Sequence, residues 1–227
     1  MTSLFDISSV LQRTMKRATA SQSRPVISKP WRDGGVYHAS IAHVMVDFRG
    51  AIAQLGRWFA TRGASVCAFA YSRFGYDGLA AWEITAGKEL IEKIVAEAGK
   101  ATQFNPRIRA RVRQGEIYTL LDGDVHSIEG GLFDGIGIVD SLFTEMARFG
   151  NVSYARGRTV TEQDGRDYFE VMADFDVPRG TSVVPLRAAF DRLERDFGGS
   201  LYGPVPKPRL RPFGSHAWAQ DTPALGV

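Results

Sequence analysis

Two aspartates stand at positions where the chain is expected to turn beside buried strands. Asp47 follows an apolar run and precedes the turn Arg49–Gly50, and Asp77 lies in a Gly-flanked segment between two further apolar runs. A lone aspartate at such a place is commonly a helix cap or a turn residue. Two carboxylates that meet at one end of a sheet, however, can hold one or two divalent cations on a nucleoside triphosphate. The pair is therefore the first candidate site.

The elements that would position these aspartates follow from the spacing of apolar residues. Short apolar runs predict strands, and apolar residues three or four apart predict helices. From residue 38 to residue 178 the order is strand, helix, strand, strand, helix, strand, strand, helix, strand, strand. We therefore predict an α+β fold with a ferredoxin-like βαββαβ core, in which helices cover one face of a mostly antiparallel sheet. The expected segments are 41–48, 52–63, 65–71, 79–84, 90–98, 108–121, 125–133, 139–146, 151–154 and 168–177.

The two ends of the chain differ from this middle in composition. Residues 4–20 have apolar side chains at helical spacing and predict an N-terminal helix, and residues 21–35 are a linker rich in Pro and Gly. A helix is expected over 185–197, followed by an extended tail that contains Pro and Arg. The predicted organisation is thus a helix and linker (1–35), a catalytic domain (36–180), and a helix with a tail (181–227).

Composition narrows the classes of function. The 227 residues are 44% hydrophobic and 23% charged, which is typical of a globular chain. Residues 36–180 carry 16 basic and 19 acidic side chains, so the net charge of +3 comes from the ends, and no nucleic-acid partner is expected. Because no apolar run is long enough to span a membrane and no signal peptide is evident, no membrane partner is expected either, and the expected location is the cytoplasm.

Most motifs that define enzyme classes are missing. The sequence has no Walker loop, no G-x-G-x-x-G, no G-x-S-x-G and no H-E-x-x-H. The four histidines have no ligand-like spacing in the sequence, and a structural or solvated role is expected for each. Cys67 is the single cysteine, which excludes an internal disulfide and every multi-cysteine zinc motif, and its apolar surroundings predict a small core residue.

Five short segments between residues 38 and 177 share their order and spacing with motifs of one enzyme family. Together they resemble the two metal-binding strands, a later strand and the dimer-interface helix of class III nucleotidyl cyclases. The segments are Met45–Gly50 (MVDFRG), Arg73–Trp82 (RFGYDGLAAW), Arg111–Glu116 (RVRQGE), Phe133–Val139 (FDGIGIV) and Gly150–Ser153 (GNVS).

The departures from the family pattern are specific. Tyr76 is inserted between the hairpin glycine and Asp77, and Ser72 stands where the family has the lysine or glutamate that reads a purine. Asp140 and Thr144 replace the asparagine and arginine of the interface helix. With these changes the chain is most similar to the pyrimidine cyclases of bacterial antiphage Pycsar systems.

This resemblance implies a homodimer that converts a pyrimidine nucleoside triphosphate to a 3′,5′-cyclic monophosphate and pyrophosphate. Asp47, Asp77 and the Phe48 carbonyl would hold two Mn²⁺ or Mg²⁺ ions, and the turn at Arg49 would present a helix N-terminus to phosphate. Arg73 or Arg148 would offset transition-state charge, although neither matches the family arginine by position. The interface helix, with Asp140, would face the partner's site.

The expected base specificity depends on the hairpin that contains Ser72 and Asp77. Ser72 is too short to reach a purine edge, and Tyr71 crowds the hairpin, so a pyrimidine is expected. Arg109, Arg111 and Arg113 favour uracil, and hence UTP, whereas a buried carboxylate such as Asp134 would select cytosine.

Two other functions stay open from the sequence. One is a catalytically inactive, cyclase-like dimer that retains nucleotide or protein binding, which the missing interface Asn and Arg favour. The other is an RNA-binding βαββαβ domain, which would need exposed aromatic side chains on its central strands, with Phe69 and Tyr71 as the candidates.

Overall fold

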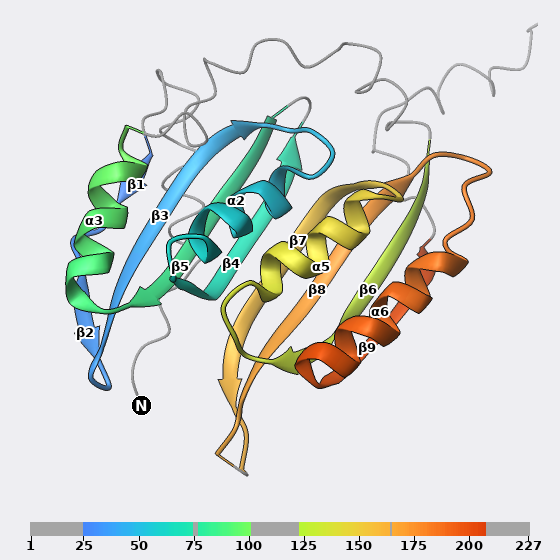
Figure 1. The fold of residues 1–227 in the computed structure, drawn as a ribbon. Coiled ribbons are helices and arrows are strands. Elements are labelled where there is room, and N and C mark those ends of the chain that lie inside the picture. The colour runs from blue at the N-terminus through green and yellow to red at the C-terminus, as the bar shows by residue number, and fades with distance from the viewer. Residues whose placement is uncertain (1–24, 75–76, 101–122, 164, 208–227) are drawn as a thin grey trace, which may run out of the picture.

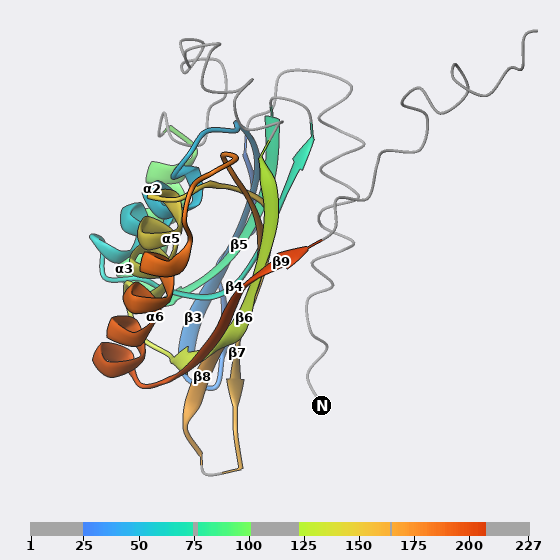
Figure 2. The same ribbon diagram turned by 90° about the vertical axis from the view of Figure 1, so that its right-hand side faces the viewer.

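The computed structural model describes residues 25–74, 77–100, 123–163 and 165–207 (Figure 1). These residues form one sheet and, on one of its faces, four helices (Figure 2). The strands are β1 (Val26–Ile27), β2 (Trp31–Asp33), β3 (Val36–Val46), β4 (Ser65–Phe74), β5 (Asp77–Ala86), β6 (Asp124–Phe133), β7 (Asn151–Thr161), β8 (Asp167–Val177) and β9 (Gly199–Lys207), and the helices are α2 (Ala51–Ala60), α3 (Lys88–Ala98), α5 (Ile138–Ala147) and α6 (Val184–Phe197).

The chain contains two copies of one arrangement, side by side in the sheet. The second repeat, β6-α5-β7-β8-α6-β9, places its strands in the order β9-β6-β8-β7, which is the ferredoxin-like order. The first repeat, β3-α2-β4-β5-α3, has the order β3-β5-β4, and the short strand β1 pairs with β3 where a fourth strand would lie. All described strand pairs are antiparallel.

The repeats meet at a seam formed by β4 and β7. These strands pair antiparallel, with Tyr71 opposite Ala155, and α2 packs against α5 directly above them. Gly56 permits this close helix contact, because a Cβ there would lie 2.8 Å from the Asp140 backbone nitrogen. The seam therefore joins the two repeats through both layers of the fold.

The hydrophobic core crosses the seam. Phe69 of β4 is fully buried, and its ring stacks on Trp82 of the first repeat at 5.4 Å between centroids. On its other side it meets Phe143 edge-on at 5.4 Å and stacks on Phe169 at 6.0 Å, both from the second repeat. Aromatic rings at these separations attract one another beyond their buried area. One core thus serves both repeats.

The predicted α+β class is confirmed, as are the mostly antiparallel sheet and the helices on one face. The chain after Phe197 differs from the expectation, because residues 199–207 form β9, which pairs with β6 instead of a tail. A domain boundary at residue 180 would therefore divide the second repeat. The expected helix over 4–20, the strand over 108–121 and the chain beyond 207 lie outside the described residues.

No helix in the described ranges is both long and apolar enough to cross a membrane.

Candidate functional site

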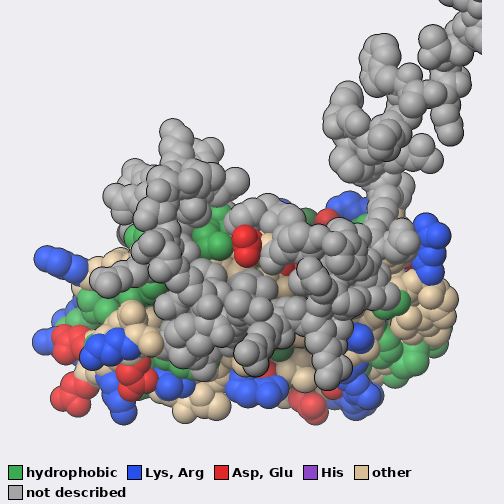
Figure 3. Space-filling model, turned by 90° about the horizontal axis from the view of Figure 1, so that it is seen from above, with side chains coloured by type: hydrophobic (Ala, Val, Ile, Leu, Met, Phe, Trp, Pro, Cys, Tyr) green, Lys and Arg blue, Asp and Glu red, His purple; other side chains and the backbone are tan. Residues whose placement is uncertain are grey.

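The sheet brings the two predicted aspartates to the same end of adjacent strands. Val46 pairs with Asp77 across β3 and β5, and Asp47 follows Val46 directly. Figure 3 looks onto this end of the sheet; acidic and hydrophobic side chains are visible near the middle of the view, and basic and acidic side chains both lie along its edge. Asp77 is half-buried, and this burial raises the pKa of its carboxyl group above the ordinary value.

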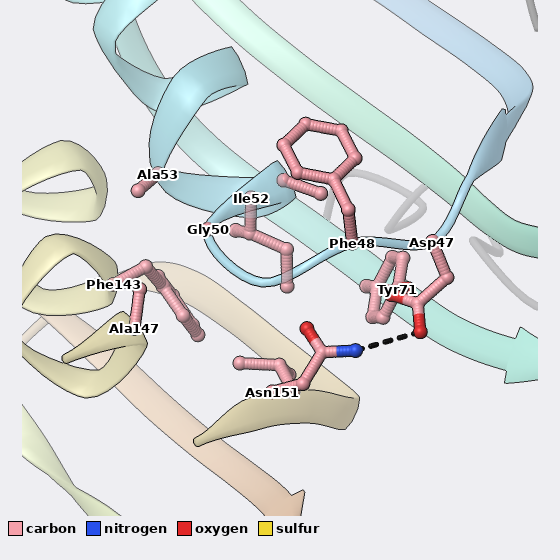
Figure 4. A pocket seen from close by; sticks show the side chains of 11 residues that line it. Asp47, Phe48, Gly50, Ile52, Ala53, Tyr71, Phe143, Ala147 and Asn151 are labelled. Carbon is pink, nitrogen blue, oxygen red and sulfur yellow. Dashed lines mark hydrogen bonds between the residues drawn. The ribbon is translucent and has the colours of Figure 1, made fainter. Parts of the chain in front are cut away.

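Asp47 is the centre of a buried hydrogen-bond network. The Tyr71 hydroxyl donates to its Oδ1 at 2.5 Å, and the Asn151 amide donates to its Oδ2 at 2.7 Å (Figure 4). Gly78 leaves room for the tyrosine, because a Cβ there would lie 2.4 Å from the Tyr71 ring. Burial raises the pKa of Asp47, although these hydrogen bonds and the Arg73 charge oppose the shift. Burial beside Asp47 also raises the pKa of the Tyr71 hydroxyl.

Arg73 links this network to the second repeat. Its guanidinium donates a hydrogen bond to the Asp176 carboxylate and lies 3.8 Å from Oδ2 of Asp47. Both carboxylates are nearly inaccessible to solvent, so the guanidinium supplies the positive charge that they need. The network therefore spans the seam, with Asp47 and Arg73 on one side and Asn151 and Asp176 on the other.

Sequence reasoning did not select Asn151 or Asp176 as site residues. In the sequence Asn151 belongs to the motif Gly150–Ser153, and Asp176 lies within the expected strand 168–177. The sequence does carry one signal for Asp176: it is a carboxylate between two apolar residues near the end of a buried strand. A charge at such a position requires a partner, and Arg73 is the partner here.

Two of the three groups expected to ligate metal, the Asp47 carboxylate and the Phe48 carbonyl, are engaged in other contacts. Each oxygen of the Asp47 carboxylate accepts one hydrogen bond, and the Phe48 carbonyl accepts one from the Ala51 amide at 3.0 Å. The Arg73 guanidinium also lies beside Asp47, where it would repel a dication. These hydrogen bonds and the neighbouring guanidinium therefore compete with a dication for the Asp47 and Phe48 oxygens.

The turn after Asp47 ties α2 to α5. Gly50 is the N-cap of α2 at a φ of 88°, in the left-handed region that glycine adopts without strain, and Asp47 does not cap the helix. Arg49 donates hydrogen bonds to the carbonyls of Ala147 and Arg148, at the C-terminal end of α5. The cavity between Asp47, Tyr71 and Asn151 is about 10 Å³, room for a single water molecule and not for a nucleotide.

Two other predicted site residues lie away from Asp47, Asp134 at the opposite end of the sheet and Asp140 in the helix layer. Asp134 follows β6, accepts a hydrogen bond from Thr159 at 2.7 Å, and has a pKa raised by burial. Asp140, in the first turn of α5, accepts hydrogen bonds from Nε and Nη2 of Arg57, each at 3.0 Å, and another from the Thr144 hydroxyl. The structure therefore does not bring Asp134 or Asp140 to Asp47. The face of α5 expected to meet a partner subunit packs against α2 of the same chain.

A larger hollow lies on the face of the sheet opposite the helices, which no described element covers. It has a volume of about 970 Å³, within the range of small-molecule sites. Ser72 is exposed there. We call this hollow the open-face groove; the other polar and aromatic residues that line it are Glu129, Phe133, Tyr154, Arg156, Arg158, Glu162, Tyr168, Glu170, Ser200 and Tyr202.

The groove combines cations with exposed aromatic rings. Arg158 pairs with Glu170 at 3.1 Å, whereas Arg156 is exposed and has no carboxylate partner among the described residues. Tyr154 is 37% exposed and Tyr202 is 64% exposed. Such a surface suits a ligand with an anionic group and a planar ring.

The two aromatic side chains named as candidates for RNA binding, Phe69 and Tyr71, do not project from this face. Phe69 and Tyr71 point into the helix-covered core and are 0% and 1% exposed. Bases cannot stack on them, so the expectation for these two residues is wrong.

No family model and no curated protein matches the chain. Among solved structures, an unknown protein from Galdieria sulphuraria is similar, with a TM-score of 0.33, 14% identity, and coverage of 74% of this chain and 96% of that one. Aspartate kinase from Synechocystis has a TM-score of 0.47 and 13% identity, and the match covers 87% of this chain and 40% of the kinase chain. A putative glycine cleavage system transcriptional repressor has a TM-score of 0.29 and 17% identity, covering 74% and 96%.

Proposed function

We propose that this chain is a nucleotide-binding protein that holds its ligand in the open-face groove and does not cyclise it. The observation that carries the proposal is the contrast between the two candidate sites. The Asp47 end has its carboxylate oxygens hydrogen-bonded and a cavity of about 10 Å³, whereas the groove offers about 970 Å³ with an exposed guanidinium. The resemblance to nucleotidyl cyclases supplies the ligand class.

The side chains of the groove match the parts of a nucleotide. Arg156 supplies a planar, permanently charged donor for phosphate oxygens. The rings of Tyr154 and Tyr202 offer apolar faces for a base. Glu129 and Glu162 line the same groove and accept hydrogen bonds from ribose hydroxyls or a base amino group. The acidic side chains also disfavour highly charged phosphate chains, so a nucleoside monophosphate or cyclic nucleotide is preferred over a triphosphate.

Replacing Arg156 with Gln is expected to weaken UMP and cyclic UMP binding about tenfold or more. A charge-assisted hydrogen bond contributes about 1.5–3 kcal/mol, and 1.4 kcal/mol corresponds to a factor of ten. Isothermal titration calorimetry on the full chain measures the change. The matched control is Arg195→Gln, an exposed arginine of α6 on the helix-covered side. Equal losses in both variants, or none in either, would place the ligand elsewhere.

Incubation of the chain with ATP, GTP, CTP and UTP and with Mn²⁺ is expected to yield no cyclic nucleotide. The physical reason is that the Asp47 oxygens accept hydrogen bonds and Arg73 lies beside them, which disfavours the binding of two cations there. Nucleotide chromatography measures the outcome. A cyclic product that depends on metal would overturn the non-catalytic part of the proposal.

A second candidate is the homodimeric uridylate cyclase that the sequence resembles. One observation favours it: the pairing of Val46 with Asp77 places two carboxylates at one end of the sheet, as a cyclase requires. In that case UTP would give cyclic UMP with Mn²⁺ or Mg²⁺, and Asp77→Asn would remove the activity. Light scattering would show twice the 25.0 kDa chain mass.

A further inference from the structure

Three side chains of metal-ligand type meet on the open face of the first repeat. They are His38 of β3, Cys67 of β4 and Glu83 of β5. One ligand atom from each, an imidazole nitrogen, the thiol sulfur and a carboxylate oxygen, lies within 4.8 Å of the other two. All three side chains are partly exposed, so a cation can reach them from solvent.

The pairing of three neighbouring strands creates this cluster. Glu83 on the middle strand β5 pairs with Ser40 of β3 and with Ala68 of β4. His38 and Glu83 alternate with the core residues Ala39 and Ile84, so they project from the face opposite the helices. The cluster therefore depends on strand register and not on proximity in sequence.

A β-bulge brings the thiol into the cluster. The β4–β5 register shifts between Val66 and Ala68, which leaves Cys67 as the extra residue. Such bulges re-aim a side chain and often lie next to functional sites. Here the Cys67 sulfur donates to the Glu83 backbone carbonyl at 3.3 Å, next to the carboxylate of the same residue. The expectation that Cys67 is a small core residue is corrected, since it lies half-buried beside two polar side chains.

Contacts with neighbouring side chains already orient the other two ligands, His38 and Glu83. Nδ1 of His38 lies 3.2 Å from Oε1 of Glu83. The Trp31 ring stacks on the imidazole at 5.4 Å between centroids and 19° between planes, which restricts its rotation. A site whose side chains are held by packing loses less conformational freedom when it binds an ion.

We propose that His38, Cys67 and Glu83 form a Zn²⁺ site with one coordination position open to solvent. The combination of imidazole, thiolate and carboxylate suits zinc, whereas Mg²⁺ and Ca²⁺ take oxygen ligands alone. The site is separate from the open-face groove and from the Asp47 network, because it shares no residue with either. It does not depend on the proposed nucleotide binding.

The dimensions agree with this assignment. Zinc bonds of about 2.0–2.3 Å in a tetrahedron place ligand atoms about 3.3–3.7 Å apart. The separation of 3.2 Å between His38 and Glu83 is already close to that value. The sulfur has to approach by at most about 1 Å, which a side-chain rotation supplies. Three protein ligands leave the fourth position to water, the arrangement of zinc sites that act as Lewis acids.

Titration of the full, tag-free chain with Co²⁺, a spectroscopic substitute for Zn²⁺, tests the site. Because Cys67 is the single cysteine of the sequence, a thiolate-to-cobalt charge-transfer band can arise from no other residue. We expect this band at one equivalent of Co²⁺ and its loss on addition of Zn²⁺. We also expect Cys67→Ala to abolish the band and Glu83→Gln to weaken Zn²⁺ binding about 10–100-fold.

The matched control for Glu83→Gln is Glu92→Gln, an exposed carboxylate of α3 on the helix-covered side of the same repeat, which should leave Zn²⁺ affinity unchanged. X-ray absorption of the zinc-loaded wild-type chain, which needs no variant to fold, should show one sulfur among lighter ligand atoms. Absence of Zn²⁺ binding, or binding without the charge-transfer band and without a sulfur ligand, would overturn the proposal.

Discussion

Replacing Arg73 with alanine is expected to lower the free energy of unfolding by about 3–5 kcal/mol, the cost of removing one partner from a buried ion pair. The guanidinium is the cation between Asp47 and Asp176, which are 7% and 2% exposed. Without it, two carboxylates from different repeats would be buried close together with a deficit of positive charge. In a chain of this length the loss corresponds to a fall in Tm of about 6–20 °C.

Thermal and urea unfolding, followed by circular dichroism, measure this effect. Arg158→Ala is the matched control. Arg158 lies on β7, the strand that pairs with β4, and its exposed side chain pairs with Glu170 of β8. An exposed pair contributes about 0–1 kcal/mol. Adding Asp176→Asn to Arg73→Ala should recover part of the lost stability, since it removes one of the two buried charges. If Arg73→Ala and Arg158→Ala cost the same, the network is not a stabilising element of the seam.

Replacing Phe69 with alanine is expected to cost about 3–5 kcal/mol, the usual penalty for truncating a fully buried phenylalanine. The ring contacts Trp82 of the first repeat and Phe143 and Phe169 of the second. The resulting cavity would therefore open between the repeats and weaken both of them. Unfolding should remain one cooperative transition at a lower denaturant concentration.

Tyr202→Ala provides the comparison for this second change. Tyr202 is also aromatic but is 64% exposed on β9, so its removal should cost less than about 1 kcal/mol. A two-step unfolding curve for Phe69→Ala, with one repeat melting before the other, would contradict the view that the repeats share one core.

The positions of helices and strands were predictable where apolar residues repeat regularly. Ile52, Leu55 and Phe59 indicate α2, and the runs on both sides of Arg73–Gly78 indicate the β4–β5 hairpin. The internal duplication of the fold was not predicted, because the two repeats have little sequence in common. In the structure, Asp47 and Gly50 bound the turn from β3 to α2 as Asp134 and Gly137 bound the turn from β6 to α5. The strand β9 was missed because Pro204 and Pro206 disfavour an internal strand, although an edge strand tolerates them.

The candidate site was predictable in part. Its place followed from the topology, since Asp47 and Asp77 do lie at one end of adjacent strands. What surrounds Asp47 did not follow, because Asn151 is 104 residues away and joins it only through the pairing of β4 with β7. For the same reason, the cluster of His38, Cys67 and Glu83 could not be predicted from the sequence. The cluster depends on the register of β3, β4 and β5 and on the bulge at Cys67, and the spacing of residues in the sequence predicts neither.

Because both repeats belong to one chain, the pairing of β4 with β7 does not depend on protein concentration. Two separate copies of a repeat would bring these edges together only above a dissociation constant, whereas within one chain the effective concentration of each edge is fixed by the connection. Two identical copies would also have identical ends. Because one chain carries both repeats, its ends can differ: Asp47 is held by a tyrosine, an asparagine and an arginine, and Asp134 by a threonine. A single molecule can therefore present two chemically distinct ends on one continuous sheet.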